Sequence, residues 1–368
     1  MLDNGKINSR QAGFLMFSFL MGSAILMIPS TVTSLAKQDG WLSVLIATVF
    51  GLGIVLIYTT LGLRFPKQSI IQYSEMILGK WIGKIVGLLY IWFPFHLGTL
   101  VIRNSSDYVA STALPDTPMI VISGLFLAVI AYGIRGGIET LGRVNEIILP
   151  FREPIVLLIV VLLLKDMKLG KLAPLLGDGV LPVLKGSFPV TSFPLGETVL
   201  FTMLLPNISN IRKLKKAYMF AIVLGGIFLT LSVISTLLVL GPSITSRLNF
   251  PVQSIIKVID IADFVTNVDS FGMLLWISSN FVKIAVCYYC TAVGIAQWFR
   301  LSDYRQMVTP VGILMLIFSM TVYENNIEQS TFAATIWPFY AMPFEVLIPL
   351  FMLLVSIIRK LDGRGRGK

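Results

Sequence analysis

Long apolar stretches recur along the whole of this 368-residue chain. Many run to about 18 residues or more, which is enough for a helix to cross a hydrocarbon core about 30 Å thick. Charged residues make up only 13% of the chain, about half the share found in soluble domains. We therefore predict an all-α integral membrane protein of about ten transmembrane helices.

Short polar segments divide the chain into ten expected spans. These lie at residues 10–36, 41–63, 81–108, 117–134, 142–164, 187–206, 216–241, 270–299, 305–323 and 334–358. Two connecting segments look amphipathic: Ser69–Leu78 is expected to form a short interfacial helix and Phe250–Phe264 a longer one with apolar and charged faces. Ordinary loop helices are the favoured alternative for both. We expect one transmembrane domain over 1–368, with five-helix halves at 10–164 and 187–358 and a basic cytoplasmic tail at 359–368.

The net charge of +10 comes from short basic clusters between the apolar runs, which argues against nucleic-acid binding. With the N-terminus inside, nineteen of the 29 Lys and Arg residues fall on the inner side, seven fall outside and three lie within spans. Basic residues concentrate in cytoplasmic loops. The charge distribution therefore predicts cytoplasmic termini and an even number of crossings.

Enzymatic and metal-binding functions lack a sequence signature. The chain has one histidine, and its two cysteines, Cys287 and Cys290, lie inside an apolar run, so neither a disulfide framework nor a zinc site is indicated. No phosphate-binding loop or nucleophile–histidine pair is present. We predict no catalytic residue, metal or cofactor. The first apolar run has no small-residue cleavage site after it and is expected to be a retained helix.

The first span of each predicted half is interrupted. The interrupting residues are Gly22, Ser23, Ala24 and Pro29 in the first span, and Pro189, Pro194 and Gly196 in the sixth. Unpaired backbone at membrane depth survives only where it is buried in protein or lines a wet cavity. Paired interruptions favour a 5+5 inverted repeat of the LeuT-like type with a ligand site at the midplane. Two unrelated proline kinks are the alternative.

Freed backbone groups near Ser23 and Ala24 can receive a carboxylate or an ammonium group; close helix packing is the alternative role for small residues at 22–24. Phe93 and Leu97 share a helix face and could wall an apolar site, although core packing is favoured. The candidate ligand-binding residues are Gly22, Ser23, Ala24, Ile25, Phe93, Leu97, Phe193, Gly196, Glu197 and Lys283.

Two charged residues stand near the expected midplane. Glu197 follows the break in the sixth span, and a carboxylate in a span is a functional candidate by default. It could recognise a ligand ammonium group, carry a proton or bind freed backbone donors, and its place in a first helical turn favours the last role. Lys283 needs a partner, and Glu197 and Glu345 are both candidates. Ligand contact, cation mimicry at an ion site and a structural salt bridge remain open for this lysine.

Charged residues in other spans have structural interpretations. Arg103 and Asp107 are four residues apart and can pair, either as part of an outer gate or as a surface pair. Arg152, beside Glu153, is expected near the inner end of its span, where an arginine can reach the interface. His96 is expected to be a hydrogen-bonded core residue.

Several short motifs resemble one family of membrane proteins. They are GSAILMIP at Gly22–Pro29, GKWIG at Gly79–Gly83, PLGE at Pro194–Glu197, and Leu205–Pro206. In order and spacing they are similar to the B subunits of GerA-type spore germinant receptors, within the amino acid–polyamine–organocation superfamily. The resemblance extends over essentially the whole chain.

The resemblance implies a germinant-sensing subunit in the inner membrane of bacterial spores. It also implies a small-molecule germinant, with an amino acid as the expected class, and partners that are an A subunit and a C lipoprotein beside the membrane lipid. Two other functions remain open for the same fold: a proton-coupled amino acid permease, and a scaffold that passes ions or water within a larger complex.

Overall fold

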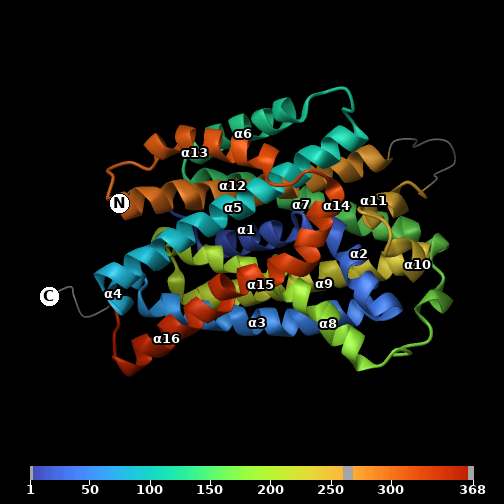
Figure 1. Cartoon of the computed structure of the whole chain (residues 1–368), viewed down its shortest axis with the longest axis horizontal. Coiled ribbons are helices and arrows are strands. Elements are labelled where there is room, and N and C mark those ends of the chain that lie inside the picture. Colours follow the sequence, from blue (N-terminus) through green and yellow to red (C-terminus); the bar gives the residue numbers. More distant parts are fainter. Residues whose placement is uncertain (1–2, 260–267, 364–368) are drawn as a thin grey trace.

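The computed structural model describes residues 3–259 and 268–363, which form helices joined by short connections (Figure 1). Its first seven α-helices are α1 (Ser9–Met21), α2 (Ala24–Ala36), α3 (Gly40–Arg64), α4 (Ile70–Leu78), α5 (Lys80–Thr112), α6 (Met119–Arg135) and α7 (Ile138–Leu163). An isolated bridge between Ile7 and Ile208 is the one β-type pairing in the described residues.

The rest of the chain contains more irregular helices. In order they are α8 (Val180–Val190), a π-turn η4 (Thr191–Leu195), a 3-10 helix η5 (Gly196–Asn207), α9 (Leu214–Leu240), α10 (Pro242–Thr245), α11 (Pro251–Ile256), α12 (Val268–Phe299), α13 (Arg305–Thr321), α14 (Asn326–Thr331), η7 (Phe332–Ile336), α15 (Trp337–Met342), η8 (Pro343–Leu347) and α16 (Ile348–Ile358).

The helix lengths agree with ten crossings. Seven helical segments in the described residues are long and apolar enough to span a membrane. One of them, Ala24–Arg64, belongs to two crossings, because its backbone turns at Lys37 (φ 49°, ψ −127°) and α3 packs against α2. Its α2 part completes the crossing that α1 begins, and α3 forms the next crossing. The shorter apolar helices α6 and α13 add two more, each about 25 Å long. The two crossings that include Ala24–Arg64, the six other segments and these two helices give the predicted ten.

Both predicted interruptions are present. Between α1 and α2, Gly22 has a non-helical backbone (φ −46°, ψ −115°). In the sixth span, α8 passes into η4, where Phe193 has an extended backbone (φ −108°, ψ 114°). The following Pro194 cannot donate a helical hydrogen bond. The breaks therefore lie where the glycine and proline pattern predicted them.

The predictions for the two connecting helices are confirmed to different extents. Ser69–Leu78 is confirmed as α4, capped by Ser69, whose backbone N–H donates to Gln72 Oε1 at 3.1 Å. Within Phe250–Phe264 the structure contains the short helix α11, and residues 260–264 lie outside the described residues. The longer helix expected there is thus confirmed only over Pro251–Ile256, because the described residues 257–259 are not helical.

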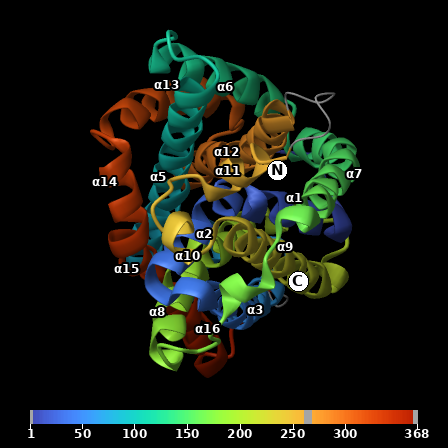
Figure 2. The same cartoon turned by 90° about the vertical axis from the view of Figure 1, so that its right-hand side faces the viewer.

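The described chain begins and ends at the same end of the bundle, as Figure 1 shows. Near its start, Ile7 bridges to Ile208, which follows η5; near its end, the Gly363 N–H donates to the Arg64 carbonyl at 2.8 Å. This arrangement requires an even number of crossings. Viewed along the long axis, α1 and α2 lie near the middle of the bundle with other helices around them (Figure 2).

The topology can be tested with single cysteines at two exposed positions, Asp178 and Lys216, in a chain whose Cys287 and Cys290 are replaced by alanine. The charge distribution predicts that a membrane-impermeant maleimide labels position 178 in intact cells, and that position 216 is labelled only after permeabilisation. Labelling of position 216 from outside would overturn the orientation.

Candidate functional site

The break in the sixth span places a carboxylate in the centre of the bundle. Glu197, the second residue of η5, has its Oε2 2.6 Å from the Nζ of Lys283 on α12, and both side chains are 0% exposed. Breaking a buried ion pair by removing one partner leaves an uncompensated charge, which is strongly destabilising. The pair therefore joins η5 to α12. Of the two predicted candidates, Glu197 is the partner of Lys283.

Lys283 also contacts the break in the first span. A Cβ on Gly22 would lie 2.9 Å from the Lys283 Cδ and 3.0 Å from the Asn280 Oδ1, so a larger residue there would push against α12. The ammonium group lies 5.0 Å from the ring centroid of Phe19 and 4.7 Å from that of Phe193. A desolvated cation over an aromatic ring gains about 2 kcal/mol. One lysine thus contacts both interrupted spans.

A second carboxyl group lies against the same backbone. Glu345 on η8 is buried, and its Oε2 accepts a hydrogen bond from the Ser192 hydroxyl on η4 at 2.9 Å. A Cβ on Gly196 would lie only 2.2 Å from that oxygen. Glycine at 196 is therefore what allows η8 to pack against the start of η5.

A small cavity of about 30 Å³ lies beside the two breaks, room for about two water molecules. Its walls come from α2, α5, η4, η5 and the α14–α15 region. The lining residues are Ser23, Met27, Leu97, Leu100, Val101, Asn104, Phe193, Glu197, Tyr323, Gln329, Phe332, Ala333 and Trp337. Four buried lining atoms have no hydrogen-bond partner among the described residues: Ser23 Oγ, Asn104 Oδ1, Glu197 Oε1 and Trp337 Nε1. The three oxygens can accept hydrogen bonds from a small polar ligand, and the Trp337 N–H can donate one.

The cavity includes part of the predicted site. Ser23, Leu97, Phe193 and Glu197 line it. Gly22, Gly196 and Lys283 do not, although each is bonded to or in contact with a lining residue.

Three other predicted ligand residues lie away from this cavity. Phe93 packs in the core, stacked on Trp337 at 5.8 Å and on Phe344 at 4.7 Å between ring centroids. Ile25 lines a separate, apolar cavity that also touches α7 and α12. Ala24 is fully buried and lines neither cavity.

The sequence analysis missed one wall of the cavity, which contains Asn104, Tyr323 and Gln329. All three are at most 8% exposed. The polar Asn104 within an apolar span was a signal that could have identified it. Gln329 precedes the predicted tenth span, 334–358. It reaches the cavity because α14 runs past it, and the positions of apolar residues in the sequence do not predict that path.

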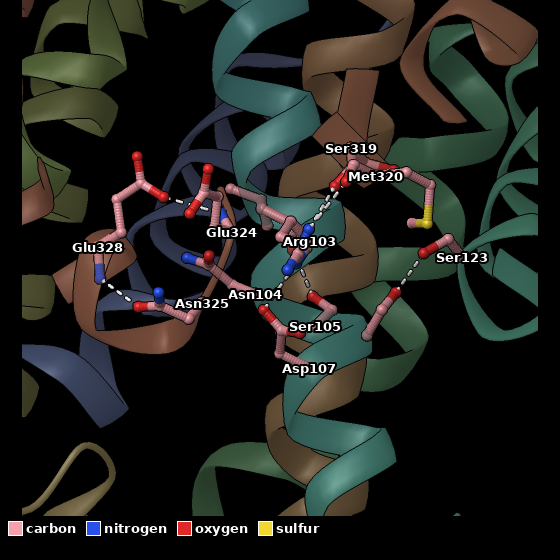
Figure 3. Close-up of polar contacts among 12 residues, drawn as sticks. Arg103, Asn104, Ser105, Asp107, Ser123, Ser319, Met320, Glu324, Asn325 and Glu328 are labelled. Atoms are coloured by element: carbon pink, nitrogen blue, oxygen red, sulfur yellow. Dashed lines mark hydrogen bonds and ion pairs between the residues drawn. The ribbon is translucent and has the colours of Figure 1, made fainter. Parts of the chain in front are cut away.

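Polar contacts join helices at the end of the bundle opposite the start of the chain. Arg103 donates to Asp107 at 3.0 Å, and its Nη1 donates to the carbonyls of Ser319 (3.3 Å) and Met320 (3.2 Å) at the end of α13, as Figure 3 shows. The predicted pairing is confirmed. The pair is buried, with both side chains less than 10% exposed, so its interpretation as a surface pair is wrong.

A second set of hydrogen bonds between helices lies at the end of the bundle where the chain starts. The Asp3 carboxylate accepts hydrogen bonds from the Tyr289 hydroxyl of α12 at 2.8 Å and from the Ile138 N–H that begins α7 at 3.0 Å. The Asn207 side chain, at the end of η5, donates to the Gly5 carbonyl at 2.9 Å. The N-terminal segment therefore links α7, α12 and the end of η5.

Two further expectations can be compared with the structure. Arg152 is only 2% exposed and bonds Glu153 and the Ser18 hydroxyl of α1, so the expectation that it reaches the membrane interface is wrong. Its guanidinium group has partners inside the protein instead. His96 has the expected hydrogen-bond partner, because its Nδ1 lies 3.1 Å from the Tyr340 hydroxyl.

The central ion pair makes a testable prediction. Glu197→Gln should lower the stability of the purified protein by about 3–5 kcal/mol, because Lys283 is left buried without its counter-charge. The double variant Glu197→Gln, Lys283→Met should recover most of that loss. Thermal unfolding in detergent micelles measures both.

The matched control is Glu146→Gln, which removes the partner of the exposed Arg10 and should change stability by less than about 1 kcal/mol. An unchanged Glu197→Gln protein would show that the central ion pair does not hold η5 to α12.

Comparisons with known proteins agree with this architecture. The chain is 30% identical over 363 residues to spore germination protein KB of Bacillus subtilis (strain 168), covering 98% of this chain and 96% of the relative, and 26% identical over 362 residues to spore germination protein YndE of the same organism, covering 96% and 97%.

Among solved structures, MhsT in complex with L-phenylalanine superposes with a TM-score of 0.72 at 14% identity, over 98% of this chain and 91% of that one. A closed nucleobase-cation-symport-1 family transporter with bromovinylhydantoin bound gives 0.69 at 16%, over 97% and 79%. The predicted LeuT-like 5+5 fold, with its first and sixth helices broken, is confirmed. The sequence profile described as spore germination protein matches residues 6–327, and the chain belongs to that family.

Proposed function

We propose that this chain is the germinant-sensing transmembrane subunit of a spore germination receptor. The observation that carries the proposal is the cavity beside the two helix breaks, lined by buried polar atoms that lack partners. Broken helices in this fold class bind small ligands at the midplane. Family membership connects such a site with germination rather than with nutrient supply alone.

The lining supports a small ligand with an ammonium group and an apolar part. Glu197 Oε1 and Asn104 Oδ1 are acceptors, so they suit hydrogen-bond donors. Phe193, Phe332 and Trp337 supply apolar wall. An amino acid has both features, and the structurally similar MhsT binds L-phenylalanine.

Ligand entry requires a larger cavity than the present one. About 30 Å³ holds about two waters, which is less than any amino acid needs. The ligand-bound conformation therefore differs from this closed one, and the ligand shifts the equilibrium by binding the two states with different affinities. A receptor uses that shift as its signal. A proton-coupled amino acid permease of the same fold would use it for transport instead.

The setting of the receptor follows from the resemblance to receptor B subunits. We propose that the chain resides in the inner spore membrane with both termini cytoplasmic, in halves 10–164 and 187–358, and assembles with an A subunit and a C lipoprotein. The partner subunits would detect the conformational change. Positive charge at the inner side suits the anionic lipid of a cytoplasmic leaflet.

A bulky residue at the first break should abolish sensing. Gly22→Leu places its side chain against Lys283 and Asn280, so we expect no germination response in spores that accumulate the variant normally. Gly53→Leu is the matched control, because nothing lies within 4 Å of a Cβ at that position of α3. A normal dose response in Gly22→Leu spores would remove the first break from the site.

Binding without concentrative transport separates a receptor from a permease. Purified protein in proteoliposomes, tested with radiolabelled amino acids and an imposed proton gradient, should show saturable binding and little uphill uptake. Asn104→Ala should weaken binding 10- to 100-fold, since a hydrogen bond to a charged group contributes about 1.5–3 kcal/mol.

The matched control is Asn145→Ala, since Asn145 is a buried asparagine of α7 that does not line the cavity. Strong uphill uptake, together with normal germination of a deletion strain, would identify a permease and exclude the receptor.

A further inference from the structure

Glu345 is a buried acid without a counter-charge among the described residues. Its side chain is 2% exposed, its Oε2 has the Ser192 hydroxyl as partner, and its Oε1 has none. The salt bridges of the described chain do not include it. The proposed ligand site does not use it either, because it does not line the cavity.

The elements packed against η8 are η5, α3, α5, α15 and α16. The cations on α3 and α5 lie elsewhere: Arg64 bonds the Ser356 and Leu361 carbonyls, Lys84 lies over the Trp298 ring, Arg103 pairs with Asp107, and Lys80 is exposed. Glu345 lies against Gly196, the residue that precedes Glu197 of η5, and Lys283 is already paired with Glu197 at 2.6 Å.

Three buried or half-buried tyrosines on the other packed helices have hydrogen bonds of their own. Tyr58 of α3 donates to Thr198, Tyr90 of α5 donates to the Phe344 carbonyl, and the Tyr340 hydroxyl of α15 contacts Trp92 and His96. Neither α16 nor η4 carries a titratable residue. One ammonium group therefore serves two carboxyl groups.

Two carboxylates and one ammonium group carry a net charge of −1, which one proton bound to a carboxylate would neutralise. An isolated carboxylate in a low-dielectric interior is far more costly than a neutral, hydrogen-bonded carboxylic acid. The backbone of η5 also closes the space beside Glu345, since even a methyl group on Gly196 would overlap its Oε2. Water has no room on that side to solvate a negative charge.

We propose that Glu345 is a proton-binding residue. In this closed conformation its carboxyl group holds a proton, so that Glu197, Lys283 and Glu345 together carry no net charge. When η8 separates from η4 and η5, the carboxyl group meets water and releases that proton to the solvent. The closed conformation then binds one more proton than the open one, so rising pH favours opening.

The proton can be observed directly, without knowledge of the germinant. Infrared spectra of the full-length protein in phospholipid nanodiscs at pH 7 should contain a carbonyl-stretch band of a protonated carboxylic acid. Glu345→Gln should remove this band. The control Glu146→Gln, at a partly exposed, paired glutamate, should leave it unchanged.

A second variant keeps the acid and changes only its hydrogen bond. Ser192→Ala removes the donor to the Glu345 carboxyl group, so the same band should move to higher wavenumber while keeping its intensity. This variant provides the test if Glu345→Gln fails to accumulate.

Absence of the band from the wild-type spectrum at pH 7, or its loss in Glu197→Gln instead of Glu345→Gln, would overturn the assignment. Because no ligand is involved, failure here is distinguishable from failure of the receptor proposal.

Discussion

The ion pair between Glu197 and Lys283 is the contact on which the centre of this protein depends. It lies at the point where two interrupted spans meet a continuous helix, and both of its charges are completely buried. Such a pair persists only when its geometry is well satisfied. Here Gly22 gives Lys283 room beside the first break, and Phe19 and Phe193 cover its ammonium group. The glycines of the two breaks therefore serve side-chain packing as well as backbone flexibility.

The polar chemistry around this pair is unevenly satisfied. Lys283 is fully engaged, whereas Glu197 and Asn104 each keep one buried oxygen without a partner, and so does Glu345 on the other side of η5. An unpaired buried polar atom is costly. The unpaired atoms of Ser23, Asn104, Glu197 and Trp337 surround one cavity beside the breaks, so a ligand there can contact them together.

Contacts at the two ends of the bundle hold the closed state. Toward one end, Arg103 joins α5 to the last carbonyls of α13; at the other, Asp3 joins the start of the chain to α7 and α12. Each tie bonds groups from different helices, so relative movement of those helices has to exchange these bonds for others. Opening at either end therefore requires these hydrogen bonds to break, and a bound ligand or a partner subunit can favour that change.

The sequence alone determined the membrane fold, the ten crossings and the two breaks, because length, apolar composition and glycine or proline placement act locally along the chain. It also singled out Glu197 and Lys283, since charges within spans are rare. Only the tertiary structure decided that these two residues pair, that Glu345 stands apart, that Arg152 is buried, and that Asn104 and Gln329 reach the cavity while Phe93 does not. The physical reason is that one helix face is as apolar as another in a membrane protein, so the pattern of residues does not fix which faces meet.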